Sequence, residues 1–354
     1  MKKRIAHISD LHFVSWKSAV WTTVKLLAGF TALGGAVWLL KRNRNAWPEF
    51  LKLLNLQSES TVNWKLLAAA LPAGTIALLE VVPLIMQAIQ FRKSSQANMD
   101  ALLDHFAKEH PDHVAITGDL TNVAHGDEFR LAQTFVHKLE SIVGKNGVTV
   151  IPGNHDADAW FSAVTGTVPP EKKLANYLKH FEEYHQKDHG HYFPTARVVG
   201  DVYLLGLDST GSNFIVPGSV TPDQLDRAGD MLESSTARNC YKVLLLHHHL
   251  KPRPTLPASL LLRLGEGIKD LALPGFTRPE DVLRLAEEKR VGHILHGHVH
   301  EMYELGDNPM LECAGSTPSP ADPEGENLYY NMLVWENGSM HAEPRAVPIP
   351  KVRK

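Results

Sequence analysis

Three histidines stand within five residues of the stretch ILHGHVHE, at His296, His298 and His300. Imidazole is the commonest metal ligand among side chains, and the spacing His-x-His places two rings on one side of an extended segment. An Asp-x-His pair near the start of the chain, Asp10 and His12, has the same spacing. The two pairs therefore predict a metal site, provided that further ligands exist between them.

Three more polar clusters carry donors of the same kinds. Asp119 lies in GDLTN, Asn154 and His155 lie in GNHD, and His247 is the first histidine of LLLHHH, where His248 is the alternative. Oxygen and imidazole donors without thiolates suit Mn, or else Fe, Zn or Mg. Seven candidate ligands exceed the need of one ion, which indicates a two-metal centre of the kind that binds a phosphoryl group. They are Asp10, His12, Asp119, Asn154, His247, His298 and His300.

The segments that must position these clusters are short apolar runs. RIAHI, DHVAI, GVTVI, KVLLL and VGHIL each read as a buried strand that ends in one of the clusters. Helical spacing lies between them, at 97–110, 127–143 and 278–289, and two β-like runs flank Asn337-Gly338, as in a hairpin. Alternating strands and helices predict an α/β fold with its ligands at the carboxyl ends of the strands.

The clusters D-x-H, G-D, G-N-H-D, H and G-H-x-H occur in this order, each after a strand-like run. In this the chain resembles the calcineurin-like metallophosphoesterase superfamily, over residues 1–15 and roughly 95–350. The resemblance implies a βαββα sandwich of two stacked mixed sheets flanked by helices. It also implies a catalytic domain made of residues 1–15 and 95–354.

The resemblance further implies a role for each cluster. His155 would contact the phosphate as a catalytic residue and protonate the departing oxygen, while a hydroxide that bridges the two metal ions attacks phosphorus. Asp119 would bridge the ions. The implied ligands are Asp10, His12, Asp119 and His300 for one ion, and Asp119, Asn154, His247 and His298 for the other.

One position departs from the pattern of some protein phosphatases in this superfamily. These have an acid three residues after the bridging aspartate, which pairs with the phosphate-contacting histidine, whereas this chain has Asn122. The difference disfavours a Ser/Thr protein phosphatase and favours small phosphodiesters, nucleotides or lipid-linked pyrophosphates. Asn122 and His155 are the candidate substrate-binding residues.

Residues 16–94 interrupt the strand and helix pattern. The stretches 26–40 and 66–79 contain no charged residue. Each is shorter than a membrane-spanning helix, which needs about 20 residues. Tryptophans and basic residues accompany them, as is typical of helices in the lipid headgroup region. We expect an inserted, membrane-associated apolar helical hairpin, with a cap over the active site or a dimer interface as the alternative.

Composition limits the partners and the compartment. The net charge of −3 gives no basic field for nucleic acid, and two separated cysteines, Cys240 and Cys313, fit a reducing compartment. We expect the chain on the cytoplasmic side of the inner (plasma) membrane, peripheral or anchored by the hairpin. The oligomeric state stays open.

The expected function is hydrolysis of a phosphodiester or pyrophosphate in a lipid-linked substrate at the membrane. In its insertion the chain is similar to the pyrophosphatases that cleave UDP-2,3-diacylglucosamine in lipid A biosynthesis. The alternative is a cyclic-nucleotide or general small-molecule phosphodiesterase that is merely anchored to the membrane. An inactive membrane scaffold is a more remote alternative, because no ligand of the pattern is missing.

Overall fold

The computed structural model describes eight ranges of the chain: 2–15, 96–157, 173–210, 218–251, 276–299, 302–306, 310–314 and 327–349. Apart from Val14 and Ser15, these residues belong to one compact unit made of Met1–Phe13 and Ser94–Lys354. The predicted hairpin at 16–94 and the candidate ligand His300 lie outside the described residues. Within the described ranges, no helix has the length and apolar character needed to cross a bilayer.

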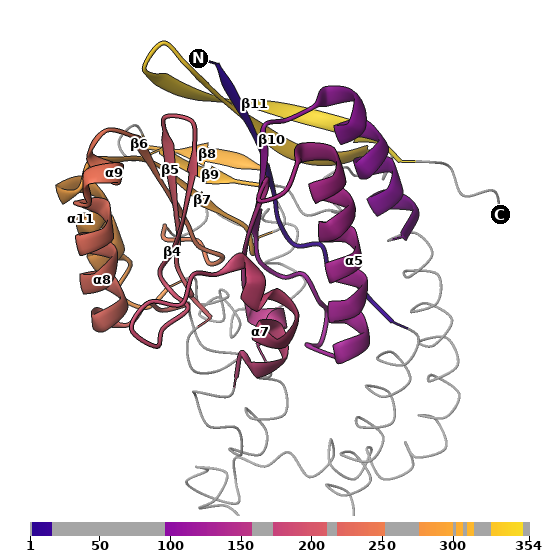
Figure 1. The fold of residues 1–354 in the computed structure, drawn as a ribbon, viewed down its shortest axis with the longest axis horizontal. Coiled ribbons are helices and arrows are strands. Elements are labelled where there is room, and N and C mark those ends of the chain that lie inside the picture. The colour runs from indigo at the N-terminus through magenta and orange to yellow at the C-terminus, as the bar shows by residue number, and fades with distance from the viewer. Residues whose placement is uncertain are drawn as a thin grey trace, which may run out of the picture. The chain divides into compact units, whose positions relative to one another are not determined.

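One sheet has five strands in the order β11-β10-β1-β2-β3 (Figure 1). Strands β1, β2 and β3 run parallel, and β10 joins β1 in antiparallel register and carries β11 at the edge. All residues of β2 and β3 are buried, as expected for parallel strands covered on both faces. The strands are Lys3–Ile8 (β1), His113–Thr117 (β2), Val148–Ile151 (β3), Asn327–Glu336 (β10) and Ser339–Pro348 (β11).

The second sheet has six strands in the order β4-β5-β6-β7-β9-β8. Its four central strands are parallel, and the edge strands β4 and β8 are antiparallel to their neighbours. The strands are Thr195–Val199 (β4), Val202–Gly206 (β5), Tyr241–Leu245 (β6), Val291–His296 (β7), Tyr303–Leu305 (β8) and Met310–Cys313 (β9).

The two sheets share a core. Side chains along β6 point alternately into this shared core and into a second hydrophobic cluster. Val243 and Leu245 belong to the cluster that contains the five-stranded sheet, whereas Leu244 belongs to a second cluster with the helices α8, α9 and α11. The ring of Tyr241 on β6 packs against Trp335 on β10, with centroids 4.7 Å apart. Helices α8 and α11 thus cover one sheet, while α5 and α7 lie on the side of the other (Figure 1). The predicted arrangement of two mixed sheets with flanking helices is confirmed.

The helices that flank the sheets have clear boundaries. Residues 96–109 are helical, and two short 3₁₀ turns lie at Asn154–Asp156 (η3) and Glu182–Tyr184 (η5). The remaining described helices are Gly126–Val143 (α5), Ala175–Phe181 (α7), Pro222–Leu232 (α8), Ser235–Arg238 (α9) and Pro279–Glu288 (α11). Three of these segments match the helices expected at 97–110, 127–143 and 278–289.

Local sequence signals explain where α5 begins and ends. The side chain of His125 accepts a hydrogen bond from the Asp127 backbone N–H and so caps the first turn. Phe129 and Phe135 are buried on one face, and Gly144 follows the helix at φ 92°, a conformation that glycine adopts without strain. The hairpin between β10 and β11 likewise turns at Asn337 (φ 53°) and Gly338 (φ 82°), as predicted.

Buried histidines far from the carboxyl ends of the strands, such as His113 at the start of β2, give a prediction about stability and pH. Burial lowers the pKa of His113 to about 3, and its Nε2 lies 2.8 Å from Thr149 Oγ1. Between pH 6.5, its ordinary pKa, and about 3, only the unfolded chain binds this proton. The free energy of unfolding should therefore fall as pH drops below about 6.5, by about 1.4 kcal/mol per pH unit for this residue.

Urea unfolding of metal-free protein from pH 7 to pH 4 measures this slope. In His113→Gln, the pH dependence of the free energy of unfolding should correspond to about one proton fewer than in the wild type. In His189→Gln, at a residue whose side chain is 89% exposed, it should be unchanged. Equal slopes for wild type and His113→Gln would contradict the assignment.

Candidate metal centre

The predicted ligands converge because neighbouring parallel strands end at the same edge of each sheet. Asp10 and His12 follow β1, Asp119 follows β2, and Asn154 opens η3 after β3. From the other sheet, His247 follows β6 and His298 follows β7. The structure thus brings together six of the seven predicted ligands, from both sheets. The seventh, His300, lies outside the described residues.

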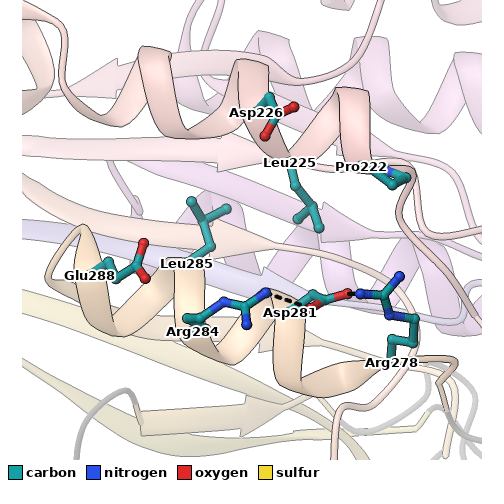
Figure 2. A pocket seen from close by; sticks show the side chains of 8 residues that line it. All are labelled: Pro222, Leu225, Asp226, Arg278, Asp281, Arg284, Leu285 and Glu288. Carbon is teal, nitrogen blue, oxygen red and sulfur yellow. Dashed lines mark hydrogen bonds and ion pairs between the residues drawn. The ribbon is translucent and has the colours of Figure 1, made fainter.

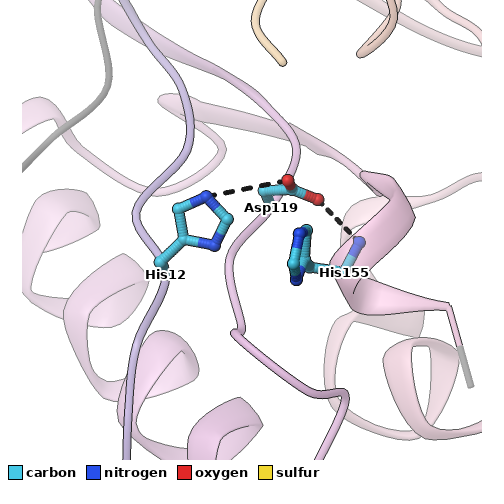
Figure 3. A group of neighbouring side chains, drawn as sticks. All are labelled: His12, Asp119 and His155. Carbon is cyan, nitrogen blue, oxygen red and sulfur yellow. Dashed lines mark hydrogen bonds and ion pairs between the residues drawn. The ribbon is translucent and has the colours of Figure 1, made fainter. Parts of the chain in front are cut away.

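Asp119 is the centre of this group. Its Oδ2 lies 3.7 Å from His12 Nε2 and 3.3 Å from His247 Nε2. Two trios have ligand atoms within 4.8 Å of one another, His12 with Asp119 and His155, and Asp10 with Asp119 and His247. Figure 3 shows His12 and His155 around the Asp119 carboxylate. Asp119 is common to both trios, of which the first includes His155, a predicted catalytic residue and not a predicted ligand.

Asn154 connects the two ligands from the second sheet. Its Oδ1 lies 3.0 Å from His247 Nε2 and 3.0 Å from His298 Nδ1. The backbone N–H of His298 donates to both oxygens of Asp10, at 3.2 and 3.1 Å. The predicted ligand sets of the two ions are therefore in direct contact. Their division between two ions remains a prediction.

His155 is held by both its backbone and its ring. Its backbone N–H donates to Asp119 Oδ1 at 2.8 Å, and its Nδ1 lies 2.7 Å from the backbone oxygen of Asn122. Because a carbonyl oxygen only accepts, Nδ1 must carry the proton, which leaves Nε2 for other partners. Asn122 thus orients His155 through its carbonyl, in place of an acidic side chain. Substrate contact by the Asn122 side chain remains a prediction.

The loops that carry the ligands are not extended. Asp10, His12, Asp119 and His298 have φ angles of 55°, 44°, 51° and 75°, in the left-handed region. The prediction that Asp10 and His12 lie on one side of an extended segment is therefore wrong, because the chain leaves β1 before these residues, and His298 likewise departs from an extended conformation. Backbone hydrogen bonds from Asp10 N–H to Gly118 and from His12 N–H to Asp119, of 3.0 and 2.9 Å, hold this conformation.

The carboxylate of Asp119 and the imidazole of His247 stabilise each other's charged forms. Burial opposes ionisation of Asp119, but the nearby rings of His247 and His155 hold the pKa of its carboxyl well below the ordinary value. Burial likewise opposes protonation of His247, but Asp119 outweighs it and raises the pKa of this imidazole to about 9. A buried carboxylate that stays ionised among imidazole nitrogens is a donor set that fits divalent metal ions.

Asp156 is the last residue of the GNHD cluster, and the sequence pattern assigns it no role. Its fully buried carboxylate accepts hydrogen bonds from the backbone N–H groups of Leu120, Thr121 and Gly153 at 3.0, 2.8 and 2.9 Å, and from Thr121 Oγ1 at 2.9 Å. It therefore ties the loop after β2 to the loop after β3. Burial, and then the charge of Asp119, raise the pKa of Asp156 to about 6.

Close approach to the carboxylates explains two glycines of the motifs. A Cβ at Gly153 would lie 2.2 Å from Asp119 Oδ1, and a Cβ at Gly297 would lie 2.4 Å from Asp10 Oδ2. Any side chain at either position would displace a predicted ligand.

Other histidines have structural partners. His7 Nε2 lies 2.9 Å from Thr117 Oγ1, and His293 Nδ1 lies 2.7 Å from the hydroxyl of Tyr241. Of the two histidines that compete for one role, His247 is the one whose ring reaches Asp119, whereas His248 turns its Nδ1 to Ser209 Oγ at 3.0 Å.

A separate groove of about 220 Å³ lies between α8 and α11 (Figure 2). Arg278 and Arg284 line it, and each pairs with Asp281 at 2.7 Å. None of the predicted site residues lines this groove, so it is distinct from the metal centre.

Several solved structures resemble the chain in fold. A dimetal phosphatase from Danio rerio is 13% identical with a TM-score of 0.49, and the match covers 73% of this chain and 90% of that one. The purple acid phosphatase PPD1 from yellow lupin (Lupinus luteus) is 12% identical with a TM-score of 0.49, over 72% of this chain and 47% of the lupin protein. At such values neither structure supports an argument about mechanism.

Sequence comparison identifies the family directly. None of the curated proteins matches the chain. The sequence model of the calcineurin-like phosphoesterases, however, matches residues 3–302, a range that holds every ligand predicted above. Because this match covers most of the 354 residues, the chain belongs to the calcineurin-like phosphoesterase family and is a metal-dependent phosphoester hydrolase.

Proposed function

We propose that this protein hydrolyses a phosphodiester or pyrophosphate with two divalent ions, Mn²⁺ foremost, held around Asp119. The observation that carries the proposal is the position of the Asp119 carboxylate, which takes part in both candidate ligand trios. Asp10, His12 and Asn154 come to it from one sheet, and His247 and His298 come from the other.

Divalent ions bound in such a site act as Lewis acids that activate water and offset charge on the phosphoryl oxygens. The chain's own residues do the remaining work. Asp119, whose carboxyl has a pKa held well below the ordinary value, would supply negative charge to the ions. His155 keeps its Nδ1 proton on the Asn122 carbonyl, so its Nε2 can hold the proton that the departing oxygen takes up.

For the substrate we propose a lipid-linked phosphate or pyrophosphate such as UDP-2,3-diacylglucosamine, cleaved at the cytoplasmic face of the inner membrane. The uncharged stretches 26–40 and 66–79 support this choice, since they directly follow the Asp10–His12 cluster in sequence. Apolar helices in the headgroup region would present an acyl-chain substrate to the site. The alternative, a small-molecule phosphodiesterase with a membrane anchor, rests on the same stretches.

The test compares Mn²⁺-dependent hydrolysis of UDP-2,3-diacylglucosamine in detergent micelles with hydrolysis of bis-p-nitrophenyl phosphate. We expect the lipid nucleotide to be turned over well above the aryl diester, and a chelator to abolish both reactions. Deletion of residues 16–93 should spare the aryl diester and remove turnover of the lipid. Activity on the aryl diester alone would favour the alternative, and a wild-type protein without bound metal or activity would refute both.

A further inference from the structure

Ser209 is a fully buried residue that no cluster of the sequence pattern contains. It lies three residues beyond the end of β5 (Val202–Gly206), the strand that runs parallel to β6 in the six-stranded sheet. Its place at the carboxyl end of β5 therefore puts it beside His247, at the carboxyl end of β6.

The hydroxyl of Ser209 has three partners. Its Oγ accepts hydrogen bonds from the backbone N–H groups of His247 at 3.1 Å and of His248 at 3.3 Å. It also lies 3.0 Å from His248 Nδ1. A serine hydroxyl offers two lone pairs and one proton, so these three bonds use its full capacity if it donates to the imidazole.

The turn at His247 and His248 is thus fixed from one side by Ser209, and the ring of His247 is fixed from the other. His247 Nδ1 lies 2.8 Å from the backbone oxygen of Thr117 and must donate to it, which directs Nε2 toward Asp119 and Asn154. The two restraints act on different parts of His247. The hydrogen bond to the ring sets the orientation of the imidazole, whereas the hydrogen bond to the backbone N–H sets the position of the main chain that bears it.

The second contact of Ser209 extends to another predicted ligand. The ring of His248, whose Nδ1 meets Ser209, packs against the ring of His298 with centroids 4.7 Å apart. Gly218 lies close to the His248 ring, since a Cβ there would lie 2.2 Å from His248 Cγ. The backbone N–H of the next residue, Ser219, donates to the Ser209 carbonyl at 3.1 Å, so Ser209 is itself held in place.

We infer that Ser209 is a positioning residue for one metal ion, because it places His247 through the backbone and His298 through the His248 ring. The inference rests on the proposed two-metal function and assigns to Ser209 the ion that Asn154, His247 and His298 would hold. Asp10 and His12, the ligands proposed for the other ion, make no hydrogen bond to Ser209 among the described contacts.

The experiment measures Mn²⁺ binding by calorimetric titration of metal-free protein, together with the EPR signal of a spin-coupled ion pair. Ser209→Ala should weaken one of the two binding steps by about 10- to 100-fold, leave the other unchanged and diminish the coupled signal. Ser209→Thr, which retains the hydroxyl, should recover part of the lost affinity. If Ser209→Ala does not fold, Ser209→Cys carries the same expectations.

Thr149→Val is the matched control. It removes a buried hydroxyl that lies 2.8 Å from an imidazole, that of His113, at the amino end of β2. The inference would be overturned if folded Ser209→Ala still showed two tight binding steps. It would also be overturned if Ser209→Ala and Thr149→Val weakened both binding steps to the same extent. Failure of the wild type to bind two ions would instead refute the proposed function itself.

Discussion

Replacement of Asp119 by alanine is expected to lower the rate of phosphodiester hydrolysis by about 10³-fold or more, which corresponds to about 4 kcal/mol of transition-state stabilisation. The reason is that its carboxylate lies 3.7 Å from His12 and 3.3 Å from His247, and is common to both candidate trios. Loss of this carboxylate should remove both ions, unlike loss of a ligand that serves one. Metal content after dialysis and kcat/KM for bis-p-nitrophenyl phosphate measure the two effects.

Asp223→Asn is the control for Asp119→Ala. It neutralises an aspartate on α8 whose side chain is 70% exposed and should change neither metal content nor rate. A folded Asp119→Ala protein that retains two ions would contradict the central place given to this carboxylate.

Replacement of Asp156 by alanine is expected to have the second large effect, although Asp156 is not a predicted ligand. It would leave the buried N–H groups of Leu120, Thr121 and Gly153 without their acceptor, and each such group costs about 1–3 kcal/mol. We expect the free energy of unfolding to fall by about 3 kcal/mol or more, because these losses fall on one small region. The loops that carry Asp119 and Asn154 should separate, so metal affinity should fall as well.

Urea unfolding and Mn²⁺ titration check the two parts of this prediction. Asp112→Ala is the matched control, since Asp112 also accepts a backbone N–H, that of Arg4 at 2.8 Å, but at the amino end of the sheet. It should lower stability without a change in metal affinity. Wild-type affinity in folded Asp156→Ala would show that the loops hold their ligands without this carboxylate.

The sequence predicts those parts of the fold that have a distinct local pattern. Strands β1, β2, β3, β6 and β7 are recognisable because each is an apolar run that ends in a polar cluster. The edge strands β4 and β8 are less distinct, since β4 is partly exposed and β8 has only three residues. The pairing of β10 with β1 joins opposite ends of the chain, which no local pattern can indicate.

The site shows the same limit at the level of single residues. Asp10, His12 and Asp119 are predictable because ligand chemistry restricts the residue types and their order. The roles of the Asp156 carboxylate and the Ser209 hydroxyl are not predictable, because an acceptor of backbone N–H groups can come from many places in the sequence. The left-handed φ angles at Asp10 and His12 also escape sequence reasoning, because they depend on backbone bonds to the loop after β2.

The hydrogen bond from His298 N–H to Asp10 joins residues 288 positions apart. Closing so long a loop costs conformational entropy, and contacts of this kind form late in folding. During synthesis the ribosome releases Asp10 first and His298 only after most of the chain. The predicted ligands would therefore come together only once the second sheet has docked on the first, and tight metal binding should report that both sheets have folded.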